Sequence, residues 1–103
     1  MYLPKIYEKF SGKFPAVFKD FKQLGQTCRE AGPLDQKSQD LVKLGIAIGA
    51  NSRGSVMSST RKALDAGASP DEIAHVVLLA LTTTGFPNMI AALQWMDEVL
   101  KDA

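Results

Sequence analysis

Three serines have the spacing that comes closest to a chemical site in this chain. Ser52, Ser55 and Ser59 are three and then four positions apart, so a helix would bring them toward one face. A serine hydroxyl can act as a nucleophile, but it is inert without a base that takes its proton. It cannot change oxidation state as a thiol does, so these serines support no disulfide exchange. The spacing therefore predicts a polar site that is formed by three hydroxyl groups and contains no base.

The candidate base is His75, the one histidine of the sequence. Imidazole gives and takes protons near neutral pH, as general acid–base catalysis requires. His75 interrupts an otherwise apolar run from Ile73 to Leu81. Two roles stay open for it: a base that reaches Ser55 or Ser59, and a hydrogen-bonded packing residue, which we favour.

The composition argues against several other kinds of site. Cys28 is the only cysteine, which excludes an internal disulfide and a C-x-x-C pair. One cysteine and one histidine far apart do not form a metal site, and we expect no cofactor. A net charge of +1, from 12 basic and 11 acidic residues, gives no field that would attract nucleic acid or an anionic membrane.

Two further sets of polar residues have alternative roles. Arg53 and Arg61 flank the serines and could hold a small carboxylate ligand by paired hydrogen bonds. We favour a solvated surface, or an ion pair between Arg61 and Asp65 four positions on. The run 82–84 is all threonine and precedes Gly85. These hydroxyls could line a pocket, or they could end a helix by bonding back to its backbone.

These residues must be positioned by helices, and the sequence predicts about six helices. Asp35 can cap one helix, and Gly67 is typical of the left-handed residue that ends another. Ser69 with Pro70 and Glu72 is a strong helix start: a serine cap, a proline at the first position and a glutamate at the third. The expected segments are 6–10, 15–32, 36–50, 54–66, 70–84 and 87–100. Because no stretch alternates with period two, we expect a single all-α domain over residues 1–103.

The apolar content of two helices predicts assembly. Residues 41–50 are apolar nearly all round apart from Lys43, and residues 73–81 are apolar apart from His75. A chain of this size has few interior helices, so we expect helices 36–50 and 70–84 to form a homo-oligomer contact. Close packing within one chain is the alternative. The last helix carries a Met and Leu stripe that we expect in the core: Met89, Leu93, Met96 and Leu100.

The chain's ends and apolar runs bear on its location. The first residues, MYLPKIYEKF, contain no apolar segment of the kind a secretory signal needs. The longest apolar runs are far short of a membrane span. We therefore expect a cytoplasmic protein.

Three motifs together resemble the carboxymuconolactone decarboxylase family, which includes the alkylhydroperoxidase D-like proteins. They are the LDxxxxDL pattern that begins at Leu34, the stretch TRKALDAGASPDEI, and GFPNMIAAL. The resemblance extends over residues 33–100. It implies an all-α bundle that assembles as a trimer, a hexamer or a related ring.

The resemblance also implies where an active site would lie. The peroxidase-like branch carries C-x-x-C followed by a histidine four positions on, and these fall at Ser52, Ser55 and Ser59. A proton-relay glutamate of that branch matches Asp40, which is one methylene shorter. In the decarboxylase branch the histidine again falls at Ser59 and a glutamate at Ser55. The candidate catalytic residues are therefore Asp40 and His75 together with these serines.

Two classes of function follow from the sequence. The favoured one is a non-redox binding or structural oligomer that keeps the family's fold. The alternative is a decarboxylase-like lyase, in which His75, Asp40 and the serines act on a small carboxylic acid or lactone. The sequence favours the first class because the second has few acids and bases within reach.

Overall fold

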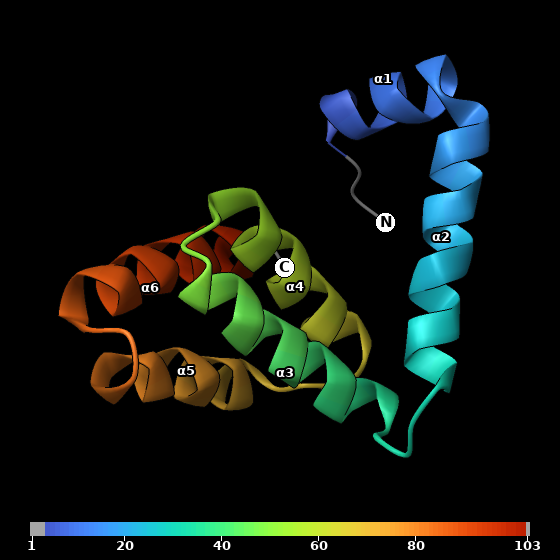
Figure 1. Ribbon diagram of the computed structural model, residues 1–103. Coiled ribbons are helices and arrows are strands. Elements are labelled where there is room, and N and C mark those ends of the chain that lie inside the picture. The colour runs from blue at the N-terminus through green and yellow to red at the C-terminus, as the bar shows by residue number, and fades with distance from the viewer. Residues whose placement is uncertain (1–3, 103) are drawn as a thin grey trace. The chain divides into compact units, whose positions relative to one another are not determined.

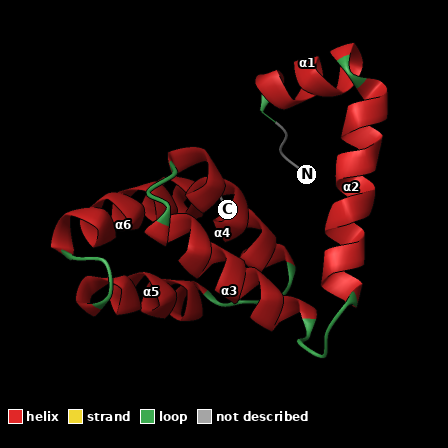
Figure 2. Cartoon of the chain, viewed as in Figure 1, coloured by secondary structure: helices red, strands yellow, loops and turns green. Residues whose placement is uncertain are grey.

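The computed structural model describes residues 4–102, and this part of the chain is all α, without strands (Figures 1 and 2). This confirms the expected fold class. The helices are α1 Lys5–Lys13, α2 Pro15–Glu30, α3 Gln36–Gly49, α4 Arg53–Asp65, α5 Pro70–Leu79 and α6 Phe86–Lys101, with a short 3-10 helix η1 at Ala80–Thr82. The chain divides into two compact units, Met1–Pro33 and Leu34–Ala103. That these units make one domain stays a prediction.

The N-terminal unit is the helix pair α1 and α2, which is held together by aromatic rings. The Phe18 ring lies 6.3 Å from that of Tyr7 and 6.2 Å from that of Phe10, both edge to face. Such ring pairs are attractive beyond the area that they bury. Neither helix has a buried residue, so the described part of this unit, residues 4–33, has no core of its own. Cys28 on α2 is also exposed.

The C-terminal unit contains the hydrophobic core, built by α3 to α6. In this unit α3 packs mainly against α4, and α6 packs against both α4 and α5 (Figure 1). The fully buried side chains include Leu44, Ile48, Val56, Ile73 and Val77. Of the predicted stripe on the last helix, Met89 and Met96 are buried, and Leu93 and Leu100 pack against the core. The interpretation of that stripe as core is confirmed.

Local capping signals position α3 and α5. Asp35 caps α3 by accepting a hydrogen bond from the Ser38 N–H at 3.1 Å, and hydrogen bonds from the Ser38 side chain and backbone lower the pKa of Asp35. Ser69 and Glu72 form the predicted capping box: the Glu72 N–H donates to Ser69 Oγ at 3.1 Å, and the Ser69 N–H donates to Glu72 Oε1 at 2.9 Å. Glu72 also pairs with Lys37 at 2.9 Å, which joins α5 to α3.

The end of α5 differs from the prediction. We expected this helix to run to Thr84, but it ends at Leu79 and tightens into η1. The Thr83 hydroxyl donates to the Leu79 carbonyl at 3.0 Å, and the Thr84 hydroxyl donates to the Ala80 carbonyl at 3.1 Å. Side chains that bond back in this way compete with the helix and end it. Gly85 then adopts a φ of 99°, which a residue with a side chain rarely adopts, and caps α6.

The capping box predicts a pH dependence of stability that is centred on Glu72. Its pKa is lowered from the usual 4.5, first by the hydrogen bond from the Ser69 backbone and then by that from Lys37. A lowered pKa in the folded state means that this stabilisation is present above the unfolded pKa and is lost as the pH falls through the folded one. In Glu72→Gln, we therefore expect the urea midpoint to fall less on acidification than in the wild type. Asp71→Asn, an exposed neighbour, is the control; equal acid sensitivity of Glu72→Gln and wild type would contradict the prediction.

Candidate functional site

The three serines lie at the start and along the first turns of α4. Ser52 is the N-cap residue, with an extended backbone, and its Oγ accepts the Ser55 N–H at 3.4 Å. Ser52 therefore caps α4. Ser55 is exposed and Ser59 is half-buried. None of these three side chains is enclosed in the core.

Asp40 lies on α3, which packs against the serine-bearing helix α4. Its side chain is buried, with 2% of its surface exposed, and it has an interaction partner within the fold. A buried acid that already has a partner is typical of a residue that supports its surroundings. Its catalytic role stays a prediction.

His75 lies on α5 and is exposed. Over residues 4–102 its imidazole has no hydrogen-bond partner, and no hydrogen bond connects it to Ser55 or Ser59. In the single chain the His75 side chain is therefore not packed against its neighbours as we favoured, and its role stays a prediction. The structure thus does not join the predicted base to the predicted hydroxyls.

The two arginines near the serines already have partners. Arg53 at the start of α4 donates to Glu98 on α6 at 2.9 Å, an exposed ion pair between two helices. Arg61 also has an interaction partner within the fold. This agrees with the favoured interpretation of these arginines as surface or ion-pair residues.

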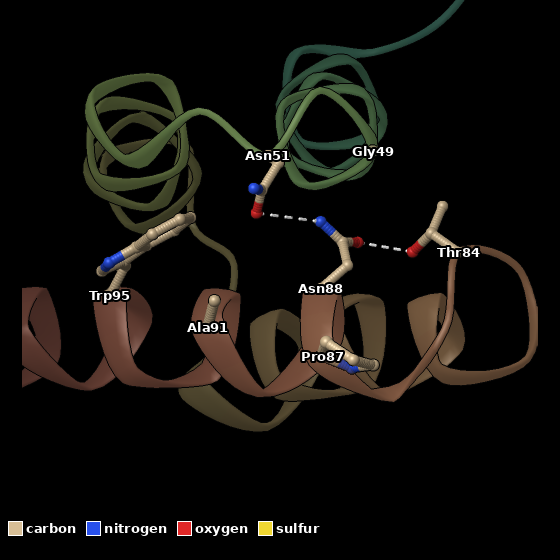
Figure 3. Close-up of a pocket in the computed structure, with 7 residues that line it drawn as sticks. All are labelled: Gly49, Asn51, Thr84, Pro87, Asn88, Ala91 and Trp95. Atoms are coloured by element: carbon tan, nitrogen blue, oxygen red, sulfur yellow. Dashed lines mark hydrogen bonds between the residues drawn. The ribbon is translucent and has the colours of Figure 1, made fainter.

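A pocket with a volume of about 440 Å³ lies elsewhere, between the α3–α4 turn and the first half of α6 (Figure 3). Its lining consists of Gly49, Asn51, Thr84, Pro87, Asn88, Ala91 and Trp95. The predicted site residues do not line it. In Figure 3 the Asn88 amide stands near one end of the hollow and the Trp95 indole at the other, with the small Ala91 between them.

Asn88 is the centre of the polar contacts in this pocket. Its Nδ2 donates to the Ile48 carbonyl at 2.7 Å and to Asn51 Oδ1 at 3.2 Å, and its Oδ1 accepts from the Thr84 hydroxyl. Both amide hydrogens of Asn88 are therefore used. Asn88 joins the start of α6 to the end of α3 and to the turn that follows it.

Sequence reasoning missed most of this pocket. Only the threonine run 82–84 was considered as a pocket lining, and Thr84 does line it while also bonding back to the helix. Asn51 offered a local signal, because asparagine often takes the left-handed conformation that it has here, with a φ of 54°. Asn88 offered none, since the two acceptors of its amide N–H groups lie 40 and 37 positions away in sequence.

Residues 15–98 match the carboxymuconolactone decarboxylase family. The chain belongs to that family. The match begins at Pro15 and therefore includes α2, which the resemblance seen in the sequence did not cover. A search of curated proteins found no match. This member of the carboxymuconolactone decarboxylase family has a single cysteine, which is exposed, and no C-x-x-C pair.

Two further features of this family member concern metal ions and membranes. In the part of the chain that the structure describes, no group of three or more His, Cys, Asp or Glu side chains is arranged to hold a metal ion. Between residues 4 and 102, every helix is too short or too polar to cross a bilayer.

Proposed function

We propose that this member of the carboxymuconolactone decarboxylase family acts as a non-redox binding or structural homo-oligomer in the cytoplasm. The observation that carries the proposal is the serine at each position of α4 and its cap where the family resemblance implies a reactive side chain. Ser52 serves as the cap of α4, and Ser55 and Ser59 follow it. A hydroxyl cannot replace a thiolate in disulfide exchange, so the fold is retained without the redox couple.

The alternative, a decarboxylase-like lyase, has less support. Such an enzyme needs a base within hydrogen-bond reach of the proton that it moves. His75 is exposed on α5 without a bond to either serine, and Asp40 is buried with a partner of its own. A small carboxylate ligand at the serine face has less support for a similar reason, since Arg53 is paired with Glu98.

The proposal includes a homo-oligomer, a trimer or a hexamer. The support for this assembly is exposed apolar surface on α3 and α5, the two helices that were expected to form the contact between subunits. Val42 and Ile46 on α3 are 51% and 67% exposed, and Leu78 and Leu79 on α5 are 55% and 57% exposed. Exposed apolar side chains in such number mark interaction surfaces on soluble proteins.

Peroxide consumption tests the non-redox proposal. With a hydroperoxide and dithiothreitol, we expect the purified protein to consume no more peroxide than the dithiol does alone. Cys28 has no resolving partner in its chain, but dithiothreitol can itself reduce an oxidised Cys28. Cys28→Ser is the control that removes this background reaction. Sustained turnover that persists in Cys28→Ser would overturn the proposal.

A further inference from the structure

We propose that α2 of one protomer packs antiparallel against α3 of a second copy of this chain. The inference rests on the proposed homo-oligomer and names the two surfaces that meet in it. One surface lies on the N-terminal helix pair, and the other is the exposed face of α3 that carries Val42 and Ile46.

The first surface is a narrow apolar stripe along α2, which we call the α2 seam. Its members are each between 48% and 60% exposed: Phe14, the N-cap residue, and Val17, Phe21 and Leu24. They are three, four and three positions apart, and so narrow a stripe is typical of a helix that packs against one other helix. Phe14 also touches the Phe10 ring of α1 and is still exposed, so α1 does not cover the seam.

The second surface is a stripe of the same spacing on α3, which we call the α3 seam. Its members, Gln39, Val42, Ile46 and Gly49, are also three, four and three positions apart. All but the half-buried Gln39 are exposed. None of the four belongs to the hydrophobic core of its own chain, so the stripe is available to a second copy.

Antiparallel packing matches the two seams in side-chain size as well as in spacing. The facing pairs are Phe14 with Gly49, Val17 with Ile46, Phe21 with Val42, and Leu24 with Gln39. A phenylalanine ring thus meets the residue that has no side chain, as interdigitating layers require, whereas parallel packing would place Phe14 against the polar Gln39. Antiparallel helices also bring opposite ends of their dipoles together.

The distribution of charge selects a contact between unlike units. Residues 1–33 contain six basic and three acidic residues and carry a net charge of +3, whereas residues 34–103 contain six basic and eight acidic residues and carry −2. The net charge of +1 for the whole chain hides this division. Opposite charges favour the helix pair of one protomer meeting the C-terminal unit of another, and like charges disfavour the pairing of two helix pairs.

The contact also fits the proposed assembly. In the proposed homo-oligomer the exposed face of α3 is covered by another subunit, and the α2 seam of that subunit is the surface that matches it. Each protomer carries one α2 seam and one α3 seam, so the contact is heterologous and repeats from one copy to the next. Contacts of this kind form a ring when the rotation closes, as a trimer requires.

The experiment crosslinks two single-cysteine proteins, Val17→Cys and Ile46→Cys, each of which also carries Cys28→Ser. One protein is labelled with nitrogen-15, the two are unfolded and refolded together, and dibromobimane joins thiols that lie close without the strict geometry of a disulfide. Mass spectrometry then identifies a product of one light and one heavy chain. Lys19→Cys in place of Val17→Cys is the matched control, because Lys19 is exposed and lies about 200° around α2 from Val17.

We expect the light–heavy product from Val17→Cys with Ile46→Cys, and only background with Lys19→Cys. The double variant Val17→Cys/Ile46→Cys, also with Cys28→Ser, should give covalent oligomers rather than single chains that are bridged internally. The proposal is overturned by absence of the light–heavy product, by equal crosslinking in the control, or by internal bridging in the double variant. Light scattering of the wild type separates the two proposals: an oligomer without this crosslink removes only the α2–α3 contact, whereas a monomer overturns the assembly itself.

Discussion

The double variant Ser52→Cys/Ser55→Cys is expected to form an internal disulfide under mild oxidation. Ser52 is the N-cap residue of α4, with φ −102° and ψ 108°, so its backbone is extended and only Ser55 lies within the helix. This geometry differs from that inside a helix, where side chains three apart have Cβ atoms about 5–6 Å from each other. A disulfide needs Cβ atoms about 3.5–4.5 Å apart, which the extended cap residue can approach.

The matched control is Ser55→Cys/Ser58→Cys, with the same spacing but both residues inside α4. All variants carry Cys28→Ser, so that the exposed thiol cannot form bridges between chains. Intact mass and resistance to alkylation measure the bridge. Loss of the Ser52 cap costs about 1 kcal/mol of stability, so circular dichroism must show that the variant is folded. A folded Ser52→Cys/Ser55→Cys protein that never oxidises, or a control that bridges equally well, would show that the α4 start has the wrong geometry.

Ile46→Glu is expected to dissociate the proposed homo-oligomer into 11.2 kDa chains. Ile46 lies on α3 and is 67% exposed in the single chain, so a charge there leaves the chain's own core intact. At the centre of a contact between subunits, the same charge would lose its hydration without a partner. Light scattering measures the mass of the wild type and of the variant.

Gln94→Glu, an exposed substitution on α6 that adds the same charge, is the control and should keep the mass of the wild type. A wild type that is a stable monomer at micromolar concentration would overturn the proposed assembly. If the wild type is an oligomer and Ile46→Glu keeps its mass, the contact does not involve this face of α3.

The features that the sequence predicted correctly depend on neighbours in the chain. Asp35 caps α3 through Ser38, and Ser69 with Glu72 forms a capping box, each within three positions. Gly67 ends the α4 segment at a φ of 96°. Such signals act through local hydrogen bonds and backbone sterics, which a sequence displays directly.

The features that the sequence did not predict depend on distant partners or on orientation. Asn88, which lines the pocket, reaches Ile48 and Asn51 on another helix and its turn. His75 was favoured as a packing residue, but in the single chain its side chain is exposed. A periodic pattern shows that a helix has an apolar side. It does not show whether a polar residue at the edge of that side is buried or exposed. The roles of Asp40, Ser55 and Ser59 stay predictions.

The long sequence separation of the Asn88 contacts has a consequence for folding kinetics. The helix pair α3–α4 is local in sequence, whereas the hydrogen bond from Asn88 to Ile48 closes a separation of 40 residues. Contacts between such distant residues require a large loop to close first, so they tend to form after local ones. Interactions absent from the transition state slow unfolding and leave the folding rate nearly unchanged. We therefore expect Asn88 to slow the unfolding of the α3–α4 turn. The rate at which α3 and α4 pair should depend instead on the sequence of these two helices.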